Sequence, residues 1–175
     1  MNLAVDRSDD DAASLTNRGP AWLPWTALAA FAALAHVLID AHIGLWGETS
    51  DDMSALQAAN AAVLGALYAW WMVIIGLAVQ GYRAALRSAL VLAVVFVGLL
   101  NGLFAFIAAP PPSAAFPYQD LAHGGSLVFG AVAGLSLWRN RTVATRDGWS
   151  FVLPLTIALV VVREVLGAVV FFQYA

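Results

Sequence analysis

The sequence of 175 residues contains no cysteine and no lysine. Without cysteine there can be no disulfide bond, no thiol catalysis and no metal or iron–sulfur site held by thiolates. Without lysine there can be no chemistry that depends on a lysine Schiff base, such as retinal binding. All eight basic residues are therefore arginine.

Charge of either sign is also scarce. Charged residues make up 11% of the chain, whereas about a quarter of a typical soluble domain is charged. Hydrophobic residues make up 62%, and the mean hydropathy is +0.80. A soluble domain of this length could not bury so much apolar surface, so its surroundings must be lipid. The length suits one compact bundle and leaves no room for a second domain.

The apolar residues fall into five runs, each long enough to cross ~30 Å of hydrocarbon at ~1.5 Å per residue. The sequence therefore predicts an all-α, five-helix transmembrane bundle in a single domain, residues 20–175, after a disordered tail, residues 1–19. Trp22 and Trp25 at one end and Trp46 at the other are predicted to anchor the first helix at the two membrane interfaces. The predicted helices cover residues 21–46, 54–80, 84–109, 117–138 and 149–173.

Seven of the eight arginines lie on one side of this predicted bundle. Two are in the tail, two at the turn between the second and third helices, and three in the loop between the fourth and fifth helices. Cytoplasmic loops carry an excess of arginine and lysine, which predicts a cytoplasmic N-terminus and an extracytoplasmic C-terminus for a multi-pass protein of the cell membrane. The alanine-rich, lysine-free composition indicates a prokaryotic chain from a GC-rich genome.

The polar residues within the apolar runs form the candidate site. Counting from the helix ends at ~1.5 Å per residue places them in one layer between the mid-plane and the extracytoplasmic surface. Ionisable groups cost free energy in hydrocarbon, so their presence there is by default a hypothesis about function. The candidate residues for a ligand site or an ion-pair network are His36, Asp40, Asn60, Asn101, Asp120, Arg163 and Glu164.

Helical spacing predicts which side chains face one another. His36 and Asp40 share a face of the first helix, and Asp120 and His123 share a face of the fourth. His42 points elsewhere and is expected at the interface. Small residues on the third and fourth helices predict that another helix approaches closely and that His123 faces protein. These small residues are Gly98, Gly102, Ala122, Ser126, Gly130 and Gly134.

Arg163 and Glu164 form the most costly pair, because an arginine at the centre of a span costs about 3 kcal/mol on insertion scales. Neighbours in a helix project in different directions, so we do not expect an ideal pair between these two alone. Arg163 is predicted to pair across the bundle with Asp40.

The first functional hypothesis is a metal or cofactor site. A divalent metal would be held by His36, Asp40, His123 and Glu164, which are nitrogen and oxygen ligands. Arg163 would repel a cation. A less favoured variant is haem b between His36 and His123. A hydrolase with a metal-activated water and Glu164 as general base stays open, but motifs such as GxSxG are absent, which favours a protein without enzymatic activity.

Three further hypotheses compete with a metal site. Intramembrane ionisable residues also suit a transporter or proton relay, and the apolar inner half of the span would restrict this function to an oligomer. Small size and glycine rows suit an accessory subunit of a larger membrane complex. A buried salt-bridge network could also have a purely structural role. The expected partners are the lipid bilayer and further membrane subunits, not nucleic acid. The combined prediction is a small membrane protein with an outward-facing polar site for a ligand or metal.

Overall fold

The computed structural model describes residues 19–46, 55–108 and 119–174, without the side chains of residues 36–46, 57, 108, 119 and 171–174. Within these ranges the chain forms five helical segments and no strand, which confirms the predicted all-α bundle. The segment ends lie within three residues of those predicted. The segments are α2 (Leu23–Trp46), α3 (Ala55–Val79), a continuous helix of α4 (Arg83–Val91), η1 (Leu92–Phe104) and α5 (Ala105–Ala108), then α6 (Gln119–Arg139) and α7 (Val152–Tyr174).

Four of these segments are long and apolar enough to cross a membrane: α3, the continuous helix from α4 to α5, α6 and α7. The described side chains of α2 contribute a shorter apolar stretch, Leu23–Ala35, although the helix itself has 24 residues. Large apolar side chains also cover the outside of the bundle, among them Phe31, Phe104 and Ile107, each at least 67% exposed. Such an exterior is stable only against hydrocarbon, so the fold is that of a helical membrane protein.

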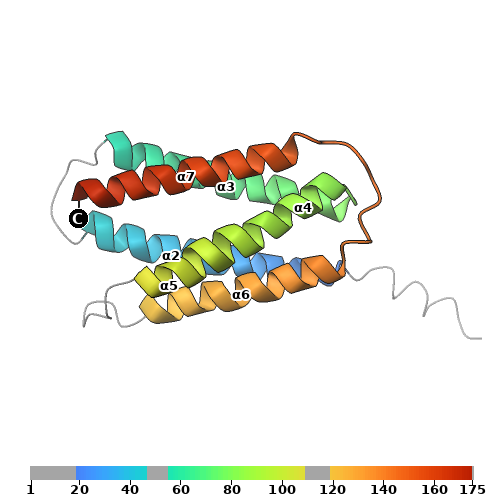
Figure 1. The fold of residues 1–175 in the computed structure, drawn as a ribbon, viewed down its shortest axis with the longest axis horizontal. Coiled ribbons are helices and arrows are strands. Elements are labelled where there is room, and N and C mark those ends of the chain that lie inside the picture. The colour runs from blue at the N-terminus through green and yellow to red at the C-terminus, as the bar shows by residue number, and fades with distance from the viewer. Residues whose placement is uncertain (1–18, 47–54, 109–118, 175) are drawn as a thin grey trace, which may run out of the picture.

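The helices form two groups that the continuous third helix connects (Figure 1). The first group is the pair α3 and α7, against which α4 packs. The second group contains α2, α6 and η1. The third helix begins beside α3 and α7 and then passes across to α6 and α2. The one polar side chain of η1, Asn101, therefore lies in the second group, whereas Arg163 of α7 lies in the first.

The seam between η1 and α6 is formed by the predicted small residues. A Cβ built on Gly130 would lie 2.7 Å from the carbonyl oxygen of Ala93 and 2.7 Å from the amide nitrogen of Gly98. A Cβ on Gly102 would lie 2.6 Å from the amide nitrogen of Leu127. No side chain fits at such distances, so glycine allows the two backbones to touch. The predicted close approach is confirmed.

The middle of the third helix is a π-helix and not the uniform α-helix that its hydrophobic pattern predicts. Over the 13 residues of η1 the backbone is wound more widely, with hydrogen bonds from i to i+5. The side chain of Asn101 follows the same spacing, because its Nδ2 donates to the carbonyl oxygen of Phe96 at 2.7 Å. Asn101 is 3% exposed. Its amide therefore stabilises the widened turn from inside the bundle.

The predicted interfacial role of Trp22 is wrong. Its side chain is 2% exposed and belongs to the hydrophobic core. Trp25, one turn further, is 41% exposed, as an interfacial anchor would be. Composition indicates that tryptophans gather at the interface, but only packing decides which of two neighbouring tryptophans turns inward.

The end of the bundle where α3 leads into α4 and α6 leads into α7 is here called the arginine-rich end. Arg146 donates its backbone N–H to the carbonyl oxygen of Gly81 at 2.9 Å, and Arg83 returns a bond to the carbonyl oxygen of Arg146 at 3.0 Å. Arg83 also forms an exposed ion pair with Asp147 at 2.9 Å. These bonds fix the loop after α6 against the start of α4. The described arginines at this end are Arg83, Arg87, Arg139, Arg141 and Arg146.

Candidate functional site

The centre of the candidate site is the ion pair of Arg163 and Glu164 in the middle of α7. Nη1 of Arg163 donates to Oε1 of Glu164 at 2.8 Å. The side chains are 16% and 30% exposed, respectively. The two neighbours do pair, because two long side chains can bend towards each other despite diverging Cα–Cβ bonds. The predicted partner Asp40 lies on α2, where the side chain is outside the described residues.

The guanidinium of Arg163 is held between α7, α3 and η1. Its Cζ lies 5.7 Å from the centroid of the Phe96 ring on η1, which is within the range of a cation–π contact. A Cβ built on Gly167, one turn further along α7, would lie 3.6 Å from Nη1 of Arg163 and 4.0 Å from Oδ1 of Asn60. Because Gly167 has no side chain, the guanidinium of Arg163 and the amide of Asn60 can both lie against the same side of α7.

Four buried polar atoms on α3 and α7 have no hydrogen-bond partner among the described residues. They are Oδ1 of Asn60, the hydroxyl of Tyr68, Nε1 of Trp71 and Nε of Arg163. In hydrocarbon an unsatisfied polar group costs several kcal/mol. The arrangement offers two N–H donors, one acceptor and one hydroxyl that can do either. Of these groups, the guanidinium of Arg163 and Oδ1 of Asn60 lie beside the same residue, Gly167, where one small polar molecule could contact both.

The three residues on α3 follow one face of the helix. Tyr68 follows Asn60 by eight residues, and Trp71 follows Tyr68 by three. At the period of an α-helix these spacings place all three side chains on the same side of α3. The rings of Tyr68 and Trp71 are stacked, with centroids 6.4 Å apart and planes 10° apart. Further along, Nε1 of Trp70 donates to Oγ1 of Thr156 at 2.9 Å, and Thr156 donates to the carbonyl oxygen of Val152. The polar groups nearer the arginine-rich end are therefore satisfied, whereas those around Arg163 are not.

A second polar cluster lies in the seam between η1 and α6. It contains Asn101, His123 and Ser126, which are 3%, 3% and 0% exposed. The prediction that His123 faces protein is confirmed. Phe96 joins the two clusters, because its ring lies beside Arg163 while its carbonyl oxygen accepts the bond from Asn101. Asp120, one turn before His123, is exposed.

The remaining predicted site residues are only partly placed. The backbone of His36, Asp40 and His42 is helical within α2, but these side chains are outside the described residues. In the described part of the chain no three His, Asp or Glu residues lie close enough to hold a metal ion. His123 belongs to the seam of η1 and α6, whereas Glu164 lies on α7 in the other group. The metal site and the haem site therefore stay predictions that depend on α2.

Sequence reasoning missed three residues of the site: Tyr68, Trp71 and Phe96. Aromatic residues are frequent in membrane helices, so composition alone does not single them out. The usable signal for the first two was their position on the same helical face as Asn60. For Phe96 there was no signal, because its position follows from the π-helical turn and from the crossing of η1 past α7.

Comparisons of the chain with protein-family models, with curated protein sequences and with solved structures give no match. The class of protein is defined by its helices, which are those of a helical membrane protein.

Proposed function

We propose that this protein binds a small polar ligand within the bilayer, with an anionic or carbonyl oxygen of the ligand directed at Arg163. The observation that carries the proposal is that Nε of Arg163 and Oδ1 of Asn60 are both unpartnered, while the guanidinium of Arg163 and this oxygen lie beside the same residue, Gly167. Among the described residues the ion-pair partner of Arg163 is the adjacent carboxylate, and N–H donors of the guanidinium, Nε among them, stay unused. A bidentate oxygen ligand is the usual partner of such a planar donor fork.

The polarity of the surrounding groups limits the class of ligand. Arg163 donates, Asn60 accepts through Oδ1, and the Tyr68 hydroxyl does either. The formal charges of Arg163 and Glu164 cancel, so a ligand with a full negative charge is not required. A carboxylate, a bicarbonate-like oxyanion or a carbonyl compound with one donor group fits this pattern. A bare divalent cation does not, because it would face the guanidinium.

Binding is favoured over conduction by the extent of the polar face. From Asn60 to Trp71 the unpartnered atoms extend over eleven residues of α3, which is about 16 Å of the ~30 Å hydrocarbon thickness. The polar face thus covers about half of the span. A transporter made from this chain would need conformational change or further subunits to cover the other half.

The test is the unfolding temperature of the purified protein in detergent, measured with acetate, bicarbonate, inorganic phosphate and chloride at matched ionic strength. An oxyanion at a hundredfold excess over its Kd should stabilise the folded protein by about 2.7 kcal/mol. Arg163→Met should remove this shift, and Arg139→Gln, at the exposed end of α6, should keep it. Shifts that are equal in the wild type and in Arg163→Met would contradict the proposal.

A purely structural pair predicts a different result. In that case no oxyanion would stabilise the wild type, or the double variant Arg163→Met/Glu164→Leu, beyond the effect of chloride at the same ionic strength. The role of an accessory subunit is tested separately, by copurification of a stoichiometric partner in mild detergent.

A further inference from the structure

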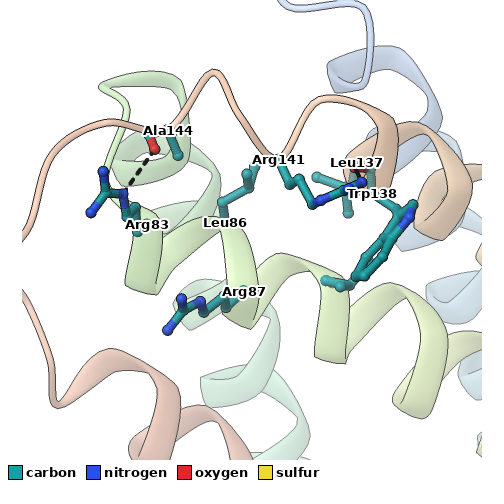
Figure 2. Close-up of a pocket in the computed structure, with 8 residues that line it drawn as sticks. Arg83, Leu86, Arg87, Leu137, Trp138, Arg141 and Ala144 are labelled. Carbon is teal, nitrogen blue, oxygen red and sulfur yellow. Dashed lines mark hydrogen bonds between the residues drawn. The ribbon is translucent and has the colours of Figure 1, made fainter.

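A pocket of about 330 Å³ lies at the arginine-rich end, far along the bundle from the Arg163 site. Its floor is the beginning of α4, its side is the last turn of α6, and the loop after α6 passes over it (Figure 2). Three guanidinium groups and no carboxylate are among its lining residues. The lining consists of Arg83, Leu86, Arg87, Leu90, Leu137, Trp138, Arg141 and Ala144.

Two of the three arginines are fixed by the chain itself. Arg83 donates through Nε to the carbonyl oxygen of Ala144 at 3.2 Å, and this bond is visible in Figure 2. Arg141 donates to the carbonyl oxygen of Trp138 at 3.0 Å, and its Cζ lies 4.3 Å from the centroid of the Trp138 ring. These contacts hold both guanidinium groups beside the pocket without neutralising Arg141.

Arg87 is the third. It is exposed, and within the described part of the chain it has no ion-pair or hydrogen-bond partner. Asp147 offsets one positive charge through its pair with Arg83. The pocket thus keeps a positive excess and a guanidinium that is free to bind a phosphate with two parallel hydrogen bonds.

A groove of about 550 Å³ continues from the pocket along the contact between the third helix and α6. It shares Leu90 and Trp138 with the pocket, and all of its lining residues are apolar or glycine. From Leu90 to Val95 it follows the helix for about 8 Å into the span. Its lining consists of Leu90, Val91, Val94, Val95, Ala131, Gly134, Leu135 and Trp138.

We propose that the pocket and the groove together bind one anionic phospholipid. Its headgroup phosphate lies among Arg83, Arg87 and Arg141, and one acyl chain follows the groove. The charge of the pocket matches the phosphate, the apolar groove matches the chain, and the two are joined in the order in which a lipid joins them. Basic pockets between helices at a membrane surface are suited to anionic headgroups. This site is independent of the ligand proposed for Arg163.

The test is native mass spectrometry of the detergent-solubilised full chain, titrated with phosphatidylglycerol or with phosphatidylcholine of the same acyl chains. The wild type should retain one phosphatidylglycerol and bind it more tightly than phosphatidylcholine. Arg87→Gln should weaken this binding about fivefold, the effect of one interfacial arginine. Arg139→Gln removes an arginine from the same end that does not line the pocket, and should leave the affinity unchanged.

A second pair of variants separates a lipid from a free phosphate. Ala131 is exposed and lines the groove, so Ala131→Phe should block the acyl chain and abolish phosphatidylglycerol binding. Ala158→Phe, an exposed position on α7, is the control and should bind as the wild type does. Equal affinity for the two lipids, or no effect of Arg87→Gln, would overturn the proposal. Stabilisation by inorganic phosphate, with phosphatidylglycerol binding unaffected by Ala131→Phe, would also overturn it and indicate a soluble phosphate ligand.

Discussion

At the scale of single residues, the fold depends on how the charge of Arg163 is accommodated in hydrocarbon. The adjacent Glu164 supplies the opposite charge at 2.8 Å, and the Phe96 ring supplies a π-face at 5.7 Å. A cation–π contact contributes about 0.5–2 kcal/mol, more where water is excluded. Nε of Arg163 and the nearby amide oxygen of Asn60 have no hydrogen-bond partner among the described residues. The hydrogen bonds around this charge are therefore only partly formed, as expected of a site that a ligand completes.

The pair should show strong coupling on mutation. Glu164→Gln leaves a largely buried guanidinium without its counter-charge and should destabilise the protein by about 2–3 kcal/mol, below the 3–5 kcal/mol of a fully buried pair. Arg163→Met/Glu164→Leu removes both charges and should restore most of that loss. Unfolding by denaturant in detergent measures both variants. Strictly additive effects would contradict a coupled pair.

The ion pair of Arg83 and Asp147 is a matched control, because its N–O distance of 2.9 Å is close to the 2.8 Å of the pair on α7 but its side chains are 49% and 82% exposed. Asp147→Asn should cost less than about 1 kcal/mol, since solvent screens an exposed pair. A cost as large as that of Glu164→Gln would mean that burial does not set the energy of the pair on α7.

At the scale of elements, the seam of η1 and α6 determines the packing of the second helix group. Its glycines could be predicted from their spacing, because small residues four apart on one helix are a direct signal of close helix approach. The π-helical winding of η1 could not be predicted from the sequence. Twelve of the 13 residues of η1 are apolar or glycine, so their pattern carries no period that would distinguish an i to i+5 helix from an α-helix; the backbone bonds, and the bond from Asn101 to the Phe96 carbonyl, show it only in the structure.

The seam makes a sharp prediction about two glycines of α6. Gly130→Ala places a methyl group 2.7 Å from the backbone of η1 and should destabilise the protein by about 1–3 kcal/mol. Gly125→Ala, on the same helix, meets nothing within 4 Å and should be neutral or stabilise by up to about 1 kcal/mol. Thermal unfolding in one detergent compares the two variants directly. A neutral Gly130→Ala would show that the helices can separate without cost.

At the scale of the whole molecule, the sequence predicted the number of helices and their ends well, because each apolar run is bounded by arginines, prolines or acidic residues. It also predicted which polar side chains face the inside of the bundle and not the lipid: Asn60, Asn101, His123, Arg163 and Glu164. It did not predict how these residues are distributed between the two helix groups. Depth counting places the polar groups of all five helices in one layer along the membrane normal, but it says nothing of the lateral contacts, which separate α3 and α7 from α2, α6 and η1. Lateral arrangement follows from packing, which hydropathy does not report.

The orientation in the membrane is a prediction at this scale too. The arginine-rich end should face the cytoplasm. Because the chain has no cysteine, a single introduced thiol can report it without background. Thr145→Cys, in the loop between α6 and α7, should react with an impermeant maleimide only after the cells are opened. Ser50→Cys, between α2 and α3, should react in intact cells. The reverse pattern would contradict the positive-inside assignment.

The central claim is that the groups around Arg163 form a site for a small polar or anionic molecule, and Gly167→Cys tests it most directly. The introduced thiol would lie beside Nη1 of Arg163 and Oδ1 of Asn60, where an added Cβ meets only ordinary contact distances. A negatively charged methanethiosulfonate should react roughly tenfold faster than a positively charged one, the effect of about 1.4 kcal/mol of attraction. Arg163→Met should abolish that preference. Gly76→Cys, exposed on α3 with nothing within 4 Å, is the control for a thiol facing lipid. Reaction of Gly167→Cys no faster than the control with either reagent would contradict the claim.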